Sequence, residues 1–209
     1  MKRLKIGVLA LQGAVSEHVE ALEKVMKKLG FEGEVVLVRK KEDLNDISGL
    51  VIPGGESTTV NRLMLKIGIR EKIIKLAKGG LPILGTCAGA ILLAKKGDEQ
   101  VKRTGTILLG LMEMKVLRNA YGRQVNSFEV DVKIPELGSK SFRTVFIRAP
   151  VIEKVWGETK VWAKHKNKII GAKKDNVLAL TFHPELTNDL RIHEYFIKTI
   201  LKVPTTYRT

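Results

Sequence analysis

The only cysteine of the chain, Cys87, lies in the segment Gly85-Thr86-Cys87-Ala88-Gly89, which follows an apolar run and precedes a run of small residues. A Gly-x-Cys-x-Gly sequence between a strand and a helix has the shape of a nucleophile elbow, a turn so tight that larger side chains at the glycines would collide. The first amides of the helix would point at the sulfur and favour the thiolate. A small buried cysteine at a strand end is the alternative. The paired glycines lead us to interpret Cys87 as a nucleophile.

The segment His183-Pro184-Glu185 offers a base and a carboxylate to orient it, directly after the apolar run Val177–Leu180. In an extended segment, residues two apart point to the same side, and a proline disfavours helix at the residue before it. A glutamate beside the ring would fix its tautomer and stabilise the imidazolium. In an open parallel sheet, functional groups gather at the carboxyl ends of strands, where both Cys87 and His183 are predicted to lie. A solvent-facing His–Glu pair is the alternative.

The other histidines, His18, His165 and His193, are predicted to lie at the surface. The chain has four histidines and one cysteine with no close ligand pairs, so we predict no metal site and expect no cofactor.

A third candidate is the loop Pro53-Gly54-Gly55-Glu56-Ser57-Thr58-Thr59. Its two glycines would let bare amides approach a ligand, and Ser57 or Thr58 is predicted to cap the following helix. We interpret the amides of Gly55 and Ala88 as a pair that receives the oxygen of a tetrahedral intermediate. An ordinary Gly-Gly turn and a phosphate cradle are alternatives, but the spacing and lysine of a Walker loop are absent.

The first half of the chain alternates strand and helix signals. Strands are expected at Lys5–Leu11, Glu34–Val38, Gly49–Ile52 and Leu81–Leu84. Helices are expected at Val15–Leu29, Thr58–Ile67, Arg70–Lys78 and Ala88–Ala94, the first of them ended by Gly30. This alternation predicts a parallel sheet covered on both faces by helices.

From about Met112 onward the strand signals follow one another in hairpin-like succession. They cover Met114–Leu117, Phe128–Val132, Val145–Ile147, Val151–Val155, Lys160–Ala163, Ile169–Ala172 and Val177–Phe182, and an amphipathic helix is predicted at Asn188–Leu201. We therefore expect one mixed α/β domain of three layers over residues 1–209, with a mostly parallel sheet.

Composition limits the class of protein. The chain has 209 residues, 44% of them hydrophobic, which provides for a sizeable core and argues against global disorder. The net charge of +15 would fit a nucleic-acid binder, but the lysines are spread along the chain and aromatic residues make up 5%. We expect a lysine-rich solvated surface, no nucleic-acid partner and no membrane partner, since the apolar stretch after Met1 is too short to span a bilayer. A lone cysteine suits a reducing compartment, so we expect a cytoplasmic protein.

Taken together and in this order, the motifs resemble those of the class I, triad-type glutamine amidotransferases, whose fold is flavodoxin-like. More closely, the chain resembles the glutaminase subunits of pyridoxal 5'-phosphate synthases. The motifs that carry the resemblance are Gly7–Ala14, Pro53–Thr59, Gly85–Gly89, Arg118-Asn119 with Gly122-Arg123-Gln124, Phe146–Pro150 and Phe182–Thr187.

The resemblance implies that Cys87 is the nucleophile and that His183 and Glu185 complete a catalytic triad. It implies that L-glutamine binds to Gly55, Glu56, Ser57, Arg118, Ile147 and Arg148, and is hydrolysed to glutamate and ammonia. A guanidinium can hold the carboxylate of glutamine, and Glu56 can answer its ammonium group.

The resemblance also implies a partner, a synthase subunit that receives the ammonia within a large hetero-oligomer and makes pyridoxal 5'-phosphate. We expect Gln12, in the loop after the first strand, to sense docking of that partner. Alternative functions are the glutaminase of another amidotransferase, for imidazole glycerol phosphate or nucleotide synthesis, and a thiol hydrolase on a related fold.

Overall fold

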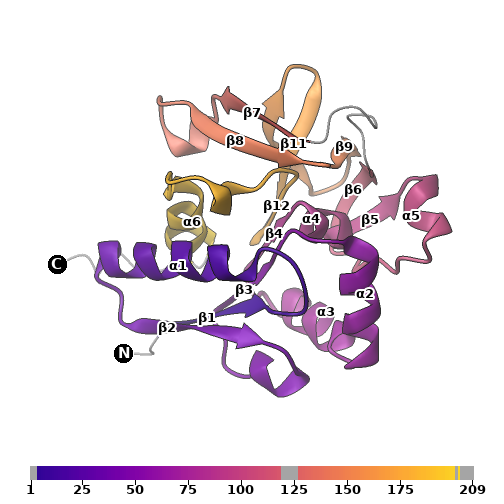
Figure 1. Ribbon diagram of the computed structural model, residues 1–209, viewed down its shortest axis with the longest axis horizontal. Coiled ribbons are helices and arrows are strands. Elements are labelled where there is room, and N and C mark those ends of the chain that lie inside the picture. Colours follow the sequence, from indigo (N-terminus) through magenta and orange to yellow (C-terminus); the bar gives the residue numbers. More distant parts are fainter. Residues whose placement is uncertain (1–3, 119–126, 201, 203–209) are drawn as a thin grey trace.

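The computed structural model describes residues 4–118, 127–200 and 202, and shows a central sheet with helices on both faces (Figure 1). The strands are β1 (Leu4–Leu9), β2 (Gly33–Val38), β3 (Gly49–Ile52), β4 (Ile83–Thr86), β5 (Ala94–Gly97), β6 (Met112–Leu117), β7 (Ser127–Val132), β8 (Phe142–Ile147), β9 (Val151–Val155), β10 (Lys160–His165), β11 (Lys168–Lys174) and β12 (Val177–Leu180). The helices are α1 (Val15–Leu29), α2 (Ser57–Lys66), α3 (Arg70–Lys78), α4 (Ala88–Leu93), α5 (Glu99–Arg103) and α6 (Arg191–Tyr195), which continues as a π-helical turn over Phe196–Ile200. Short 3-10 turns cover Lys41–Leu44, Pro135–Leu137 and Pro184–Leu186.

The large sheet has the order β2-β1-β3-β4-β12-β11-β9-β6-β5, with β10 paired to β11. From β2 to β12 every neighbouring pair is parallel. From β12 to β6 the neighbours are antiparallel, and β5 lies parallel to β6 at the far edge. The predicted α/β class with a mixed sheet is therefore confirmed, and β7 and β8 form a separate hairpin.

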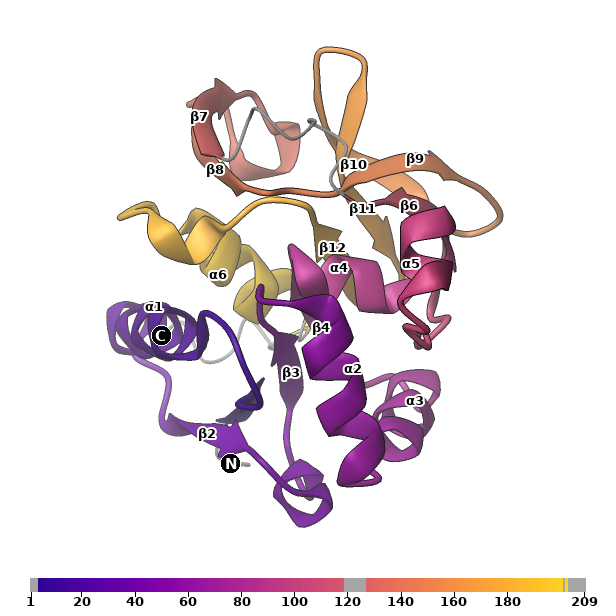
Figure 2. The ribbon, with the colours of Figure 1, turned by 45° about the vertical axis from the view of Figure 1, so that its right-hand side comes forward.

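The alternation of side chains along the central strands divides the core between the two faces of the sheet. Leu50 and Ile52 of β3 pack into a cluster with α2 and α3, whereas Val51 packs into a second cluster with α1, α6 and the β7–β8 hairpin. The strands β4 and β12 divide in the same way. Figure 2 shows α1 and α6 on one side of β3 and β4, with α2 and α3 on the other. The layers therefore follow from strands that are apolar on both faces.

Some elements differ from their predicted bounds. The strand β5 and the helix α5 were not predicted, because β5 contains Lys95 and Lys96 and α5 has 5 residues, too few for a helical period. The predicted last strand ends at Leu180, and the predicted last helix is an α-helix that changes to π-helical geometry at Phe196. Among the described residues, no helix is long and apolar enough to cross a membrane.

The edge of the sheet is held by a half-buried carboxylate. Glu113 of β6 accepts hydrogen bonds from Lys95 of β5 at 2.6 Å and from Lys174 of β11 at 2.9 Å. The hydrogen bonds from Lys174 and Lys95 outweigh burial and lower the pKa of Glu113 to about 2. Glu113 therefore joins three strands through one charge.

We expect Glu113→Gln to lower the free energy of unfolding at pH 7 by about 1–2 kcal/mol, because two charge-assisted hydrogen bonds are weakened. A carboxyl with a depressed folded-state pKa contributes its stability above its ordinary pKa, and this contribution is lost as the pH falls. The difference between wild type and variant should therefore narrow between about pH 4.5 and pH 2 in urea unfolding curves. The exposed Glu136 supplies the control, Glu136→Gln, and a gap for Glu113→Gln that does not change with pH would contradict this account.

Candidate active site

Cys87 lies in the one-residue turn between β4 and α4, with φ at 48° and ψ at −102°. This left-handed region is costly for any residue with a side chain and is found at functional sites. The flanking glycines make the turn possible. A Cβ on Gly89 would lie 2.0 Å from the carbonyl oxygen of Ile52, and one on Gly85 would lie 2.9 Å from the backbone of Gly89. The tight turn predicted from the Gly-x-Cys-x-Gly spacing is therefore confirmed as geometry.

The sheet register brings His183 to the cysteine. The strand β12 lies beside β4 with Leu180 opposite Thr86, and the Cys87 amide donates to the Leu180 carbonyl oxygen at 2.8 Å. The chain continues past Leu180 to His183, whose amide donates to Val145 of β8 at 2.8 Å. A Cβ on Gly54 would lie 2.4 Å from the Cε1 atom of His183 and 3.1 Å from the Cβ of Cys87. The imidazole and the cysteine therefore flank the same glycine.

Glu185 lies next to the imidazole on the side away from the pocket. Its Oε1 atom is 2.7 Å from Nδ1 of His183, and both side chains are buried. The contact is made across the 3-10 turn Pro184–Leu186, not along an extended segment as predicted. Burial disfavours the charged ring, but the hydrogen bonds and charges of Cys87 and Glu185 outweigh it and raise the pKa of His183 to about 10. The arrangement therefore stabilises an imidazolium beside the sulfur.

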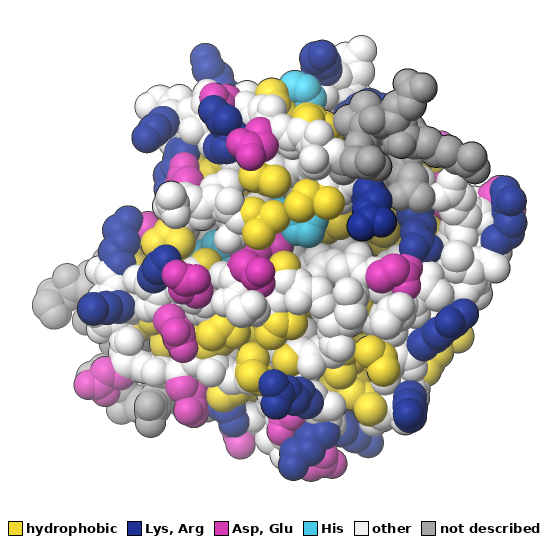
Figure 3. Space-filling model, viewed as in Figure 1, with side chains coloured by type: hydrophobic (Ala, Val, Ile, Leu, Met, Phe, Trp, Pro, Cys, Tyr) yellow, Lys and Arg dark blue, Asp and Glu magenta, His cyan; other side chains and the backbone are white. Residues whose placement is uncertain are grey.

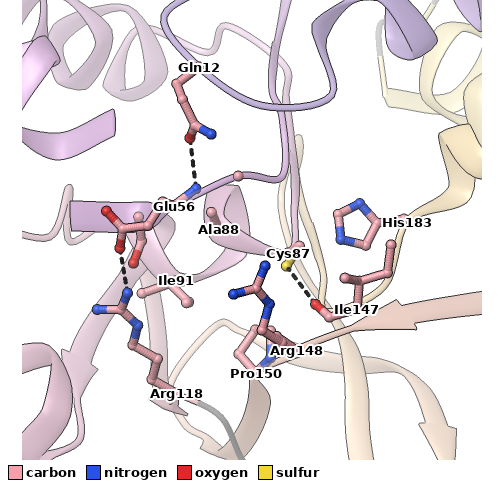
Figure 4. Close-up of a pocket in the computed structure, with 12 residues that line it drawn as sticks. Gln12, Glu56, Cys87, Ala88, Ile91, Arg118, Ile147, Arg148, Pro150 and His183 are labelled. Carbon is pink, nitrogen blue, oxygen red and sulfur yellow. Dashed lines mark hydrogen bonds and ion pairs between the residues drawn. The ribbon is translucent and has the colours of Figure 1, made fainter. Parts of the chain in front are cut away.

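A pocket of about 370 Å³ opens in front of these residues (Figure 4). It is lined by Gln12, Gly55, Glu56, Ser57, Cys87, Ala88, Ile91, Arg118, Ile147, Arg148, Pro150 and His183. Every residue proposed from the sequence for catalysis or binding therefore lies on this wall except Glu185, which stands behind His183. Ile91 and Pro150 were not predicted, because an apolar wall residue has no signal that separates it from the core.

Glu56 and Arg118 form an ion pair on the pocket wall. The Glu56 carboxylate also caps α2, accepting from the amides of Thr58 at 3.1 Å and Thr59 at 2.7 Å. The predicted cap, Ser57 or Thr58, is therefore wrong, since Glu56 precedes the helix in extended conformation and its longer side chain folds back. Burial opposes ionisation, but the hydrogen bonds from Thr59, Thr58 and Arg118 outweigh it and lower the pKa of Glu56 to about 2.

Gln12 reaches the loop that carries Gly55. Its Oε1 atom accepts the Glu56 amide at 2.7 Å, and it would lie 2.4 Å from a Cβ on Gly55. Opposite this loop, Sγ of Cys87 lies 3.9 Å from the carbonyl oxygen of Ile147. The next residue, Arg148, has φ at 43°, a second strained position beside the pocket. Figure 4 shows the Gln12 amide and the Ile147 carbonyl on opposite sides of Cys87.

The prediction that His18 and His193 lie at the surface is wrong, since both side chains are fully buried. A signal was present: His18, Leu22 and Val25 lie on one buried stripe of α1 at helical spacing. His165 lies at the end of β10 and is half-buried. Asn119 and the segment Gly122-Arg123-Gln124 lie outside the described residues. Within the described ranges, no group of three or more His, Cys, Asp or Glu residues is arranged to hold a metal ion.

The basic residues do not form one surface feature on the face shown in Figure 3. Lys and Arg side chains are spread over this face and are interleaved with Asp and Glu. This distribution agrees with the expected solvated surface. The absence of a nucleic-acid partner stays a prediction.

Comparison with known proteins gives consistent results. The family model described as the SNO glutamine amidotransferase family matches residues 8–202. Two relatives described as pyridoxal 5'-phosphate synthase subunit PdxT are similar to the chain. The protein from Methanosarcina mazei is 53% identical, over 95% of this chain and 99% of the relative. The protein from Archaeoglobus fulgidus is 49% identical, over 93% of this chain and 98% of the relative.

A solved structure described as a glutamine amidotransferase superimposes with a TM-score of 0.82 at 44% identity, and covers 95% of this chain and 99% of that one. The predicted amidotransferase fold is therefore confirmed. The match of the family model over most of the chain places this protein in the SNO glutamine amidotransferase family.

Proposed function

We propose that this protein hydrolyses L-glutamine to L-glutamate and ammonia, as the glutaminase subunit of a pyridoxal 5'-phosphate synthase. The observation that carries the proposal is the convergence of Cys87, His183 and the Glu56–Arg118 pair on one pocket. The family, and the sequence identity of 53% and 49% to the two PdxT relatives, support the same function.

In the proposed reaction, the Cys87 thiolate attacks the side-chain amide carbon of glutamine. The His183 imidazolium donates a proton to the departing nitrogen, and ammonia leaves a glutamyl thioester on the sulfur. The neutral imidazole then takes a proton from water, which attacks the thioester and releases glutamate. The raised pKa of His183 suits the first step, because the ring is charged before the nitrogen departs. The amides of Gly55 and Ala88 are proposed to receive the oxyanion of both tetrahedral intermediates.

Recognition of glutamine is proposed to depend on the two opposite charges of the pocket wall. A free amino acid carries a carboxylate and an ammonium group on one carbon. Arg118 and Glu56, which lie side by side, carry the opposite charges and can bind the carboxylate and the ammonium group respectively. Ser57, Ile147 and Arg148 line the same pocket and complete the proposed binding surface. The volume of about 370 Å³ lies within the range of small-molecule sites.

The partner proposed for this chain is the synthase subunit of a cytoplasmic hetero-oligomer. Free ammonia is protonated and lost in water, so a glutaminase is useful when its product passes directly to a partner. The PdxT relatives are named as subunits, which supports this assembly. We propose that Gln12 senses docking, because it links the loop after β1 to the backbone beside the proposed oxyanion site.

We expect Cys87→Ala to abolish ammonia release from glutamine, because the chain contains no other cysteine to replace the nucleophile. With the synthase subunit present and ammonium chloride supplied, pyridoxal 5'-phosphate formation should continue at the wild-type rate. Both rates can be followed with glutamate dehydrogenase and by pyridoxal phosphate absorbance. Glutamine hydrolysis by the variant would remove Cys87 from its proposed role.

We expect Arg118→Gln to raise KM for glutamine at least tenfold with a smaller change in kcat. The reason is that the proposed ion pair between Arg118 and the carboxylate of glutamine stabilises the bound substrate and the transition state equally. Steady-state glutaminase assays on the complex give both constants. Arg143→Gln is the matched control, since Arg143 forms its ion pairs with Glu129 and Asp131 on the β7–β8 hairpin, away from the pocket. An unchanged KM for Arg118→Gln would exclude this residue from glutamine binding.

We expect Gln12→Ala to lower kcat of the glutaminase in the complex by roughly tenfold or more, because the Glu56 amide loses its acceptor and the loop loses its support. Gln12→Glu keeps an oxygen at that position and should retain more activity. Synthase activity with added ammonium should be normal in both variants. If Gln12→Ala hydrolysed glutamine at the wild-type rate in the complex, its sensing role would have to be abandoned.

A further inference from the structure

Behind Glu185 lies a buried polar chain that the proposed reaction does not use. His18 of α1 makes two hydrogen bonds, from its Nε2 atom to Oγ1 of Thr86 at 3.0 Å and between its Nδ1 atom and Nε2 of His193 at 3.1 Å. Its Nε2 atom is also 3.2 Å from Oε2 of Glu185, an oxygen that has no hydrogen-bond partner among the described residues. All four side chains are buried, and His18, Thr86 and His193 are fully so. Two imidazoles buried side by side behind a carboxylate are an expensive arrangement unless their protons are well placed.

The partners determine where the protons lie. A carboxylate oxygen only accepts, so a lone pair on Nε2 of His18 would face Glu185 as acceptor against acceptor. The proton of His18 is therefore on Nε2, and its Nδ1 atom accepts from the Nε2–H group of His193. That leaves Nδ1 of His193 as a lone pair, and among the described residues this atom has no hydrogen-bond partner. An unpartnered lone pair is less costly there than an unpartnered N–H group.

Burial favours the neutral form of both rings. Burial is the largest influence on both, and it lowers the pKa of His18 below its ordinary value and that of His193 to about 3. The groups that face His18 are Glu185 and Glu17, which act against burial, and His183, which acts with it. A neutral His18 offers Glu185 an N–H dipole without a competing charge, so the carboxylate keeps its charge for the His183 imidazolium.

The same imidazole is tied to the loop that faces the sulfur. Thr86 lies directly before Cys87, and its hydroxyl oxygen accepts the Gly54 amide at 3.0 Å as well as contacting His18. Gly54 in turn lies so close to His183 and Cys87 that a Cβ at this position would collide with both. One chain of contacts therefore runs from the Glu185 carboxylate, through His18 and Thr86, to the loop Pro53–Thr59, which we call the glycine loop.

We propose that His18 is a positioning residue: its neutral Nε2–H group hydrogen-bonds Thr86, which fixes the glycine loop relative to the triad, and the dipole of the same N–H group, 3.2 Å from the second oxygen of Glu185, stabilises that carboxylate. His193 selects the tautomer of His18. The inference rests on the proposed function only for its activity readout, since the arrangement can be tested on the sulfur itself.

The test is alkylation of Cys87 by iodoacetamide as a function of pH, which reports thiolate and is unambiguous because the chain has 1 cysteine. The variants are His18→Gln, whose amide nitrogen can occupy the position of Nε2, and His18→Asn, whose amide nitrogen reaches only that of Nδ1. Without an N–H dipole close to its second oxygen, the buried Glu185 is harder to ionise. In the pH profile of the alkylation rate, the acid limb of His18→Asn should therefore move to higher pH by roughly one unit. At a given pH on that limb, this variant should be alkylated about tenfold more slowly, whereas the profile of His18→Gln should stay near that of wild type.

Val25→Ala is the control for loss of stability, because Val25 is fully buried on the same helix but lies two turns away from His18. It should leave the pH midpoint of alkylation unchanged. In the complex, His18→Asn should lower kcat for glutamine about tenfold with little change in KM. If wild type did not hydrolyse glutamine, the proposed function would fail, whereas the alkylation profiles would still decide the role of His18.

A nitrogen-15 spectrum of the wild-type histidines tests the same point without any variant, and the chain has 4 histidines to assign. We expect His18 and His193 to be neutral Nε2–H tautomers at pH 7. The proposal would be overturned if wild type and His18→Asn had equal alkylation midpoints, or if both His18 variants showed the same displacement. It would also be overturned if His18 were charged or carried its proton on Nδ1.

Discussion

The parallel pairing of β12 with β4 is the constraint on which the site depends. The two strands are far apart in sequence, and their register sets Leu180 opposite Thr86, so both chains leave the sheet at the same edge. The amide of Cys87 is tied back to Leu180, which fixes the strained turn against the strand that leads to His183. A shift of one residue in this register would turn every side chain of β12 to the other face, and would lose the core and the site together. Stability and chemistry therefore rest on the same hydrogen bonds.

The order of strands and helices in the first half could be predicted because buried parallel strands are continuous apolar runs, such as Gly49–Ile52, whereas half-exposed strands alternate apolar and polar residues. The same reasoning fails at the sheet edge. In β5 the side chains of Lys95 and Lys96 are exposed, so the apolar signal is absent. The helix α5 is too short for a period, although Asp98 before it caps the amide of Val101 and offered a local sign. Edge elements are determined by their neighbours more than by their own residues.

The positions of Cys87 and His183 could be predicted because the glycines and the proline around them restrict the backbone locally. The ion pair of Glu56 with Arg118 could not be predicted, since the two residues are far apart in the sequence and only the fold brings them together. The surface position predicted for His18 is wrong for a different reason: histidine is often exposed, but this one lies on the apolar stripe of α1, and its place on the helix determines its burial. That the chain forms one domain, and that each site residue has its assigned role, stay predictions.

The position of α1 explains how one helix can serve both parts of the site. Its first residues follow the loop of Gln12, and the amide of Ala14 donates to the carbonyl oxygen of Gly54 at 3.1 Å. One turn later, His18 reaches Glu185 and Thr86. The glycine loop and the triad carboxylate are thus held from the same rigid element, and a displacement of the start of α1 changes both at once. Apolar packing can slide without losing a partner, whereas a buried polar contact is lost when its groups move apart, so the contacts of Ala14 and His18 restrict the position of α1 more strictly than its apolar face does.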